Sequence, residues 1–388
     1  MELGGAERSL IGLLRSIDYS RCNVDLFLCR HTGELMEAIP PQVNLLPEQP
    51  AAAAIAKPIR SLLKSPRTWG IAVARVLAKL FSASYNALHK CQGDNIVEIN
   101  CIHKFCQPFL PRIEKNKVYD LAVSFLAPHY LGVNKVHAKK RAAWIHTDYK
   151  NVAINVKSER KIWSRYDYVA SVSEQCTKSF REVFGDLGNQ LIDFENILEP
   201  SVVRSDAEKP LELSIPDGSI SLCSVGRFAY PKNFDTVPAI CRSLIERGLP
   251  VRWYIIGFGP DESLIRQKIA EEKMEEHVIL LGKKDNPYPY IKACQIYVQP
   301  SRYEGKAVTV REAQILGKPV VITAFQTAQA QLTDGYDGII VPMDTQGCAD
   351  GIASLLNDVD LQERLSHNCL QNDYGNQKEI EKLYRFME

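Results

Sequence analysis

The sequence predicts an α/β protein built from two doubly wound domains, each a parallel sheet with helices on both faces. Two observations favour this fold class. The 388 residues suffice for two domains of ordinary size, each with its own core. Short segments rich in Val and Ile alternate with amphipathic segments along the chain, most regularly in its second half, as expected for successive βαβ units.

The first domain is predicted to span residues 1–200. Residues 3–17 indicate a glycine turn followed by an amphipathic helix, a unit that normally follows a first β-strand. That strand is absent, so we expect either that the chain begins upstream of Met1 or that the fold compensates, and we prefer the first. Further strands are predicted at 24–29, 43–46, 119–125, 142–149 and 168–173, with a helix at 174–184.

Residues 49–93 contain no acidic residue, although basic residues are interleaved with apolar ones. Such a segment is a candidate for lying on an anionic membrane surface, and equally for a pair of surface helices with extended lysine side chains. Arg75 and Lys79 interrupt its longest apolar run, so it is too short to span a bilayer. The basic residues are Lys57, Arg60, Lys64, Arg67, Arg75, Lys79 and Lys90.

The second domain is predicted at 201–375, after a polar, proline-containing linker at 199–217. A charged amphipathic helix at 376–388 is expected to pack back on the first domain. The six strands predicted in the second domain are residues 220–225, 251–256, 278–281, 296–299, 320–323 and 338–341.

Composition restricts the class of partner and the compartment. A net charge of +1 gives no general case for nucleic-acid binding. Eleven cysteines without paired spacings, after an opening that lacks a signal peptide, predict a reducing cytoplasm. Cys101, His103 and Cys106 form a tight group, but no second pair of ligands lies nearby, so free thiols are expected rather than a zinc site.

Residues 301–319 contain the strongest candidate site. Glu304 precedes a predicted short helix that carries Glu312 and ends before Gly317 and Pro319. The amides at the start of this helix would suit a phosphate, and Glu312 could accept hydrogen bonds from hydroxyl groups. The amides concerned are those of Gly305, Lys306, Ala307 and Val308.

Two further groups follow predicted strands. Gly226, Arg227 and Lys232 come after the strand at 220–225, where two cations could neutralise a diphosphate. Because the carboxyl ends of parallel strands share one edge of a sheet, this group and the helix start after Gly305 should converge. His146 and Asp148 lie near the end of the strand at 142–149, a position typical of ligand contacts, although a lone histidine is more often structural.

Gly257, Phe258, Gly259 and Pro260 resemble half of a dinucleotide-binding fingerprint. Glu262 occupies the third glycine position, and the unit does not follow a first strand. A tight turn beside the site explains these residues better than a dehydrogenase.

Taken together, these motifs resemble the family 4 glycosyltransferases, retaining enzymes of the GT-B fold, and the later motifs are similar to those of bacterial capsule and exopolysaccharide enzymes. The resemblance implies two Rossmann-like domains facing a cleft, the first of them lacking its first strand here. It rests on Gly4-Gly5-Ala6-Glu7, Trp144-Ile145-His146, Gly226-Arg227 with Lys232-Asn233, Gly257 to Pro260, and Glu304 with Glu312.

The resemblance also implies residue roles. Arg227 and Lys232 would hold the diphosphate of a nucleotide sugar, Glu312 the ribose hydroxyls and Glu304 the donor sugar, with the amides of residues 305–308 beside the sugar and phosphates. His146 would orient the donor sugar, and Gly5 would lie under the diphosphate. Gly226 and Gly257 would line the donor site.

The function implied is transfer of a sugar to a lipid-linked or oligosaccharide acceptor in surface polysaccharide synthesis, at the inner face of the membrane. No metal or other cofactor is expected, since no Asp-x-Asp cluster adjoins the site and cations with a helix start can stabilise the leaving phosphate. The alternatives are a non-catalytic nucleotide-sugar-binding partner of another transferase, or an epimerase or phosphorylase of the same fold.

Overall fold

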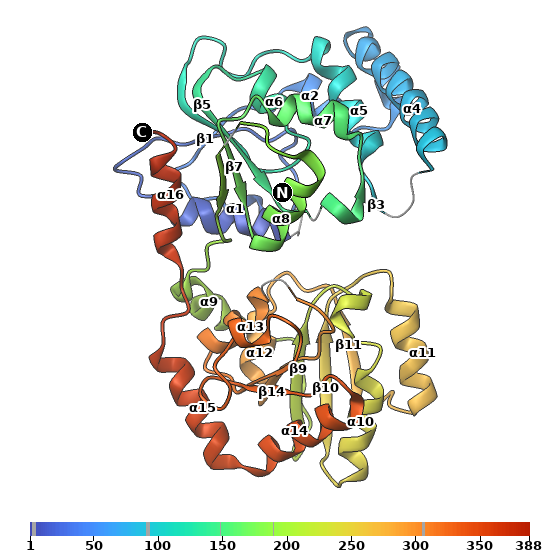
Figure 1. Cartoon of the computed structure of the whole chain (residues 1–388), viewed down its shortest axis with the longest axis vertical. Helices are drawn as coiled ribbons and strands as arrows, with labels where there is room; N and C mark the ends of the chain where they lie inside the picture. The colour runs from blue at the N-terminus through green and yellow to red at the C-terminus, as the bar shows by residue number, and fades with distance from the viewer. Residues whose placement is uncertain (2–4, 91–93, 148, 189, 305–306) are drawn as a thin grey trace. The chain divides into compact units, whose positions relative to one another are not determined.

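The computed structural model describes residues 1, 5–90, 94–147, 149–188, 190–304 and 307–388, which form two compact units (Figure 1). The first unit comprises Met1–Ile197 and Asn376–Glu388, and the second comprises Leu198–Gly375. Both units are mixed α/β with parallel sheets, which confirms the predicted fold class.

The second unit is built on a six-stranded parallel sheet. All six strands were predicted, four of them with the observed bounds, and their order is β11-β10-β9-β12-β13-β14. The chain therefore extends the sheet in one direction from β9 and in the other from β12, so the strand order reverses between these two neighbours. The strands are β9 (Ile220–Val225), β10 (Val251–Ile256), β11 (Val278–Gly282), β12 (Ile296–Gln299), β13 (Val320–Thr323) and β14 (Ile339–Val341).

Both faces of this sheet are covered, because successive strand side chains point to opposite faces and both sets are apolar. Trp253 and Ile255 pack beneath α10, α11 and α14, whereas Tyr254 and Ile256 pack beneath α12 and α13. The helices are α10 (Val237–Glu246), α11 (Glu262–Glu272), α12 (Tyr288–Ala293), α13 (Val308–Ile315), α14 (Thr345–Asn357) and α15 (Val359–Gln371), with 3-10 turns η5 (Tyr230–Lys232) and η6 (Ala328–Ala330).

The predicted linker at 199–217 is in part wrong, because it contains helix α9 (Pro200–Ala207). Pro200 occupies the first turn of this helix, where a proline lacks only an N–H that would have no helical partner. Val203 and Ala207 are buried, and α9 packs against α12 and α13. The segment predicted as a linker from its prolines and polar residues therefore contains a helix of the second unit.

The main sheet of the first unit has four parallel strands in the order β4-β5-β7-β8, and two strand pairs, β1-β2 and β3-β6, lie outside it. Among the described residues, no strand precedes the first helix. β5 begins at Ala138, four residues before its predicted start, because its basic first half pairs with β4. The strands are β1 (Asp25–Leu26), β2 (Asn44–Leu45), β3 (Asp94–Asn95), β4 (Tyr119–Ser124), β5 (Ala138–Ile145), β6 (Val152–Ala153), β7 (Tyr168–Ser171) and β8 (Gln190–Asp193).

Helices cover both faces of this sheet as well. Trp144 and Ala170 pack with α1 and α16, and Ala143 and Val169 pack with α7 and α8. The C-terminal residues thus complete the core of the first unit. The helices are α1 (Gly5–Arg15), α6 (Tyr130–Asn134), α7 (Val156–Trp163), α8 (Glu174–Phe184) and α16 (Ile380–Arg385), with 3-10 turns η1 (Glu34–Met36), η3 (Gln107–Phe109), η4 (Tyr149–Asn151) and η7 (Gln377–Glu379).

The basic segment at 49–93 is helical over most of its described residues. It forms α2 (Pro50–Ala54), α3 (Ile59–Leu62), η2 (Pro66–Thr68) and the long α4 (Trp69–His89), which packs against α5 (Val97–Cys106). Within the part of the chain that the structure describes, no helix combines the length and the apolar character needed to cross a bilayer. Cys101 and Cys106 on α5 are not in disulfide bonds.

Candidate functional site

The candidate site in the second unit lies where the strand order reverses between β9 and β12. In open parallel sheets, the loops that leave two such neighbours turn to opposite faces and leave a crevice at the carboxyl edge. Gly226 to Lys232 follow β9, and Ser301 to Glu304 follow β12. Topology therefore brings together two predicted groups that are about 70 residues apart in the sequence.

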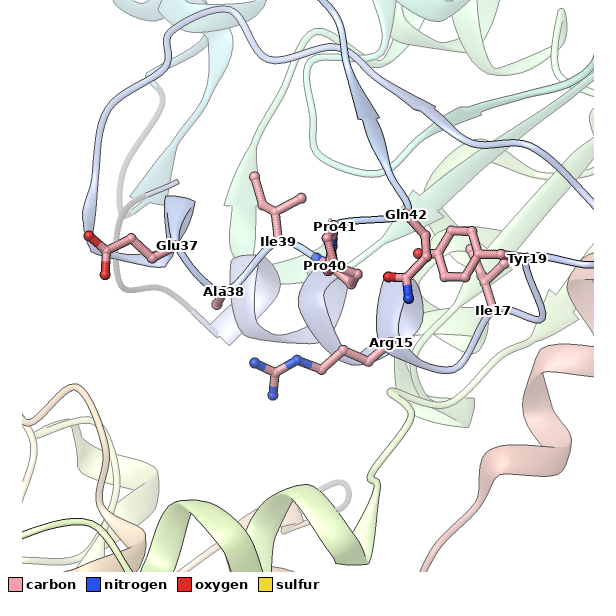
Figure 2. A pocket seen from close by; sticks show the side chains of 9 residues that line it. All are labelled: Arg15, Ile17, Tyr19, Glu37, Ala38, Ile39, Pro40, Pro41 and Gln42. Carbon is pink, nitrogen blue, oxygen red and sulfur yellow. The ribbon is translucent and has the colours of Figure 1, made fainter.

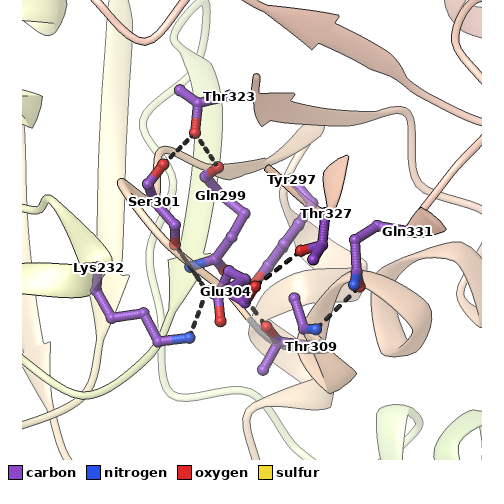
Figure 3. A network of polar contacts seen from close by, with 10 residues as sticks. Lys232, Tyr297, Gln299, Ser301, Glu304, Thr309, Thr323, Thr327 and Gln331 are labelled. Carbon is purple, nitrogen blue, oxygen red and sulfur yellow. Dashed lines mark hydrogen bonds and ion pairs between the residues drawn. The ribbon is translucent and has the colours of Figure 1, made fainter. Parts of the chain in front are cut away.

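Lys232 and Glu304 form an ion pair, with 2.5 Å between Lys232 Nζ and Glu304 Oε1 (Figure 3). The glutamate side chain is only 8 % exposed and that of the lysine 22 %. Arg227, on the same loop as Lys232, is exposed. The loop after β9 thus offers one cation held by a carboxylate and one that faces solvent, a pair suited to phosphate oxygens.

Hydrogen bonds connect the two loops. The guanidinium of Arg302 forms two parallel hydrogen bonds to the Asp235 carboxylate, of 2.8 and 2.7 Å, and the Arg302 amide donates to the carbonyl of Pro231 at 2.8 Å. The Asn233 side-chain amide donates to the carbonyl of Pro300 at 2.9 Å. These hydrogen bonds hold the backbones of the two loops together. The positions of Lys232 and Glu304 relative to each other are therefore fixed by the loops that carry them.

Polar side chains that sequence reasoning missed lie beside Glu304 and hold it (Figure 3). Ser301 Oγ donates to Glu304 Oε1 at 2.7 Å, and Gln299 Nε2 lies 2.9 Å from Ser301 Oγ and 3.3 Å from Glu304 Oε1. Tyr297 donates its hydroxyl to Gln299 Oε1 at 2.7 Å, and burial raises the pKa of this tyrosine well above its usual value, so it remains a donor. The sequence signal that could have identified these residues is the presence of polar side chains at the end of an apolar strand.

The predicted helix start is present as α13. Its first residue is Val308, and Gly317, with φ of 67°, occupies the position after its C-cap as predicted. The Ala307 amide donates to Gln331 Oε1 at 2.9 Å, and the Thr327 hydroxyl donates to the carbonyl of Glu304 at 2.8 Å. Gly305 and Lys306 lie outside the described residues.

Glu312, on α13, is 8 % exposed and accepts a hydrogen bond of 2.8 Å from the Tyr288 hydroxyl on α12. Glu312 was predicted from the sequence as a site residue, whereas Tyr288 was not. A carboxylate held in this way keeps one orientation.

Gly226 and Gly257 meet at the carboxyl ends of β9 and β10. A Cβ atom on Gly257, where φ is 154°, would lie 1.8 Å from the carbonyl oxygen of Gly226. One on Gly259 would lie 2.3 Å from the carbonyl oxygen of Phe228. The glycines therefore let two loops touch beside the site, which agrees with the tight turn predicted for residues 257–260.

His146 and Gly5 belong to the first unit. Gly5 is the first residue of α1, while Gly4 and Asp148 lie outside the described residues. His146 follows the end of β5, its ring lies 4.8 Å from that of Phe125, and burial lowers its pKa to about 4. Its Nε2 is buried without a hydrogen-bond partner among the described residues, so at neutral pH it is an uncharged imidazole.

A hollow of about 460 Å³ in the first unit lies beyond the end of α1 (Figure 2). Arg15, Tyr19 and Glu37 provide polar groups at its rim, and Ile39 and Pro40 provide apolar ones. None of the predicted site residues lines it. Among the residues that the structure describes, no cluster of three or more His, Cys, Asp or Glu side chains could hold a metal ion.

Solved structures show the same fold. Anabaena HepE, solved in complex with UDP and glucose, has a TM-score of 0.60 at 14 % identity, covering 99 % of this chain and 95 % of that one. A TarM mutant of S. aureus, solved with UDP among its ligands, has a TM-score of 0.56 at 18 % identity, covering 73 % of this chain and 58 % of that one. These likenesses place the chain in the GT-B fold.

Sequence relatives are glycosyltransferases matched over part of their length. The alpha-D-kanosaminyltransferase of Streptomyces kanamyceticus is 28 % identical over 37 % of this chain and 38 % of its own. The capsular polysaccharide biosynthesis glycosyltransferase CapM of Staphylococcus aureus is 26 % identical over 41 % of this chain and 44 % of its own. The chain thus covers less than half of either relative.

The family model described as "Glycosyl transferases group 1" matches residues 205–371. That range lies inside the second unit and includes both loops of the candidate site. The match therefore falls on the unit that contains the candidate site.

Proposed function

We propose that the chain is a retaining glycosyltransferase that moves a sugar from a nucleoside-diphosphate sugar to a lipid-linked or oligosaccharide acceptor. The observation that carries this proposal is the Lys232–Glu304 pair, held at the strand-order reversal of the unit that the glycosyl transferases group 1 family model matches.

Breaking the bond between a sugar and a nucleoside diphosphate develops negative charge on the leaving phosphate. Arg227 and Lys232 would carry the opposing charge, and the amides at the start of α13 would add the positive end of a helix dipole. Because Lys232 is held by Glu304 before the donor binds, it would favour the charged transition state over the ground state.

Two carboxylates would position the donor. Glu304 would accept hydrogen bonds from hydroxyls of the donor sugar, and Glu312 from those of the ribose. His146 would add an uncharged imidazole near the sugar, and Gly5 would allow the diphosphate a close approach. Retention follows in this proposal from attack on the same face of the sugar as the leaving phosphate, which accepts the acceptor's proton.

A donor with a uridine base is the first to test. HepE was solved with UDP and glucose and TarM with UDP, so a uridine diphosphate sugar is the proposed donor class. The proposed process is the synthesis of surface polysaccharide, since CapM acts in capsular polysaccharide biosynthesis. We propose that no metal is required, so activity should persist in a chelator.

We place this activity in the cytoplasm, at the inner face of the cell membrane. Ten cysteines among the described residues are free thiols, which supports a reducing compartment. A lipid-linked acceptor would be presented there, and residues 49–93 would contact the anionic surface.

The test is hydrolysis and transfer of UDP-glucose and UDP-N-acetylglucosamine by the purified chain, with a parallel thermal-shift series of uridine, guanosine, cytidine and deoxythymidine diphosphates. Arg227→Ala should reduce turnover by about 100-fold or more, in the range seen when one charge-stabilising group is removed. Arg266→Ala is the matched control, because Arg266 is exposed on α11 and paired with Glu262.

Unchanged hydrolysis in Arg227→Ala would refute the site assignment. A thermal shift with nucleoside diphosphates but no turnover with any donor would favour the alternative, a nucleotide-sugar-binding partner of another transferase.

A further inference from the structure

The outer face of α4 is apolar and exposed. Seven large apolar side chains of this helix are between 44 and 80 % exposed. At about 100° per residue they fall within an arc of about 140° on one side of the helix. They are Trp69, Val73, Val76, Leu77, Leu80, Phe81 and Leu88.

The opposite face of α4 is already packed. Ile71, Ala72, Ala74 and Ala78 are buried against residues of α2, α3 and α5. Surface helices normally present polar residues to water, and contiguous exposed apolar residues mark a contact site. The outer face is therefore a second apolar surface, separate from the one that anchors the helix.

Charge indicates which kind of partner this face contacts. No acidic residue occurs between positions 49 and 93, and exposed basic residues precede the apolar face, lie beside it and follow it. The adjoining helix α5 contains a single acidic residue, Glu98. The exposed cations are Lys57, Arg60, Lys64, Arg67, Lys79 and Lys90.

We propose that the outer face of α4 inserts into the boundary between headgroups and acyl chains of an anionic bilayer, with these cations contacting lipid phosphates. A second copy of the chain fits less well, because a two-fold contact through α4 would bring the same basic segment against itself. The inference rests on the membrane location proposed above and not on the transfer chemistry.

Trp69 reports on this insertion. Its side chain is 54 % exposed, and its indole Nε1 donates to the carbonyl of Leu63 at 3.0 Å, which fixes the ring at the start of the face. The other three tryptophans, Trp144, Trp163 and Trp253, are at most 2 % exposed. A blue shift of tryptophan fluorescence on adding vesicles therefore reports the surroundings of Trp69.

The experiment is co-sedimentation of the full chain with vesicles of phosphatidylcholine, with and without phosphatidylglycerol, together with tryptophan fluorescence. We expect binding and a blue shift with anionic vesicles only, weakened by salt. The double variant Leu77→Glu/Leu80→Glu and the triple variant Lys57→Gln/Lys64→Gln/Arg67→Gln should each bind at least tenfold more weakly. Val359→Glu, which changes an exposed apolar residue of the second unit, should bind as the wild type does.

Equal binding by wild type and Leu77→Glu/Leu80→Glu, or equal binding to neutral and anionic vesicles, would overturn the inference. So would self-association in sedimentation velocity that the double variant abolishes, without vesicle binding. Donor hydrolysis without vesicles is measured on the same samples. Hydrolysis without vesicle binding refutes only the membrane inference, and vesicle binding without hydrolysis refutes only the proposed chemistry.

Discussion

Oε1 of Glu304 accepts hydrogen bonds from three side chains, those of Lys232, Gln299 and Ser301. Gln299 and Ser301 are fully buried, so neither can exchange its partner for water. The arrangement holds the glutamate in one orientation, which a sugar-binding carboxylate needs before the ligand arrives.

Ser301→Ala removes one of these donors and leaves polar atoms of Gln299 and Glu304 less well satisfied. We expect the free energy of unfolding to fall by about 1–3 kcal/mol, the cost of an unsatisfied buried polar group. Denaturant unfolding measures it. Ser201→Ala, at an exposed serine of α9, is the control and should change stability by less than about 0.5 kcal/mol; equal losses in the two variants would contradict the assigned role of Ser301.

The sequence predicted those site residues that lie at strand ends. Lys232 and Glu304 follow apolar strands that are recognisable from their composition, and the parallel sheet brings their loops together. Tyr288 and Gln331 could not be predicted, because each reaches its partner across 24 residues of chain whose path depends on helix packing. The roles assigned to the site residues remain predictions.

The turns after β9 and β10 are in backbone contact, so Gly257→Ala should disturb both. The new methyl group would overlap the carbonyl of Gly226, and we expect a loss of more than about 2 kcal/mol in stability together with weaker nucleotide binding. Gly248→Ala is the matched control: its φ is also positive, at 82°, but nothing lies within 4 Å of the new methyl. Gly248→Ala should lower the free energy of unfolding by about 1–2 kcal/mol, because alanine is disfavoured in the left-handed conformation, and should leave nucleotide binding unchanged.

Buried histidines make the first unit sensitive to acid. Burial lowers the pKa of His129 to about 3, and its ring lies 4.6 Å from that of Trp163, between β4 and α7. The unfolded chain takes up a proton near pH 6.5, so below this pH protonation favours unfolding. Stability should fall by about 1.4 kcal/mol per pH unit for such a histidine between pH 6 and 4.

The measurement is the free energy of unfolding against pH for wild type and His129→Gln. The two curves should be parallel above pH 7, and their difference should change below pH 6, with the wild type losing stability faster. Curves that stay parallel down to pH 4 would show that the His129 imidazole does not resist protonation.

Strands were predicted best where both faces of the sheet are buried. β9, β10, β12 and β13 are largely apolar segments with clear ends, and their predicted bounds are the observed ones. The basic first half of β5 does not have the composition of a strand. It forms a strand because it pairs with β4, and the composition of the segment does not reveal that pairing. Helix α9 was not predicted, because a proline can mark either a break in regular structure or, as Pro200 does, the first turn of a helix.

Each unit has its own core, and the C-terminal residues belong to that of the first. Phe386 is buried, stacks on Tyr168 with ring centroids 4.4 Å apart, and contacts Trp144. Phe386→Ala should destabilise the first unit by about 3–5 kcal/mol. In hydrogen exchange, amides of β7 should lose protection while those of β9 keep theirs; loss of protection in both would contradict the independence of the two cores.

Because residues 376–388 complete the first unit, the second unit is in effect an insertion within the first. During synthesis, Trp144 and Tyr168 emerge from the ribosome roughly 220 to 240 residues before the phenylalanine that covers them. At about 5–20 residues per second, that interval lasts on the order of ten to fifty seconds. The second unit is synthesised within that interval, so the part of the chain made first completes its core only after the second unit has emerged.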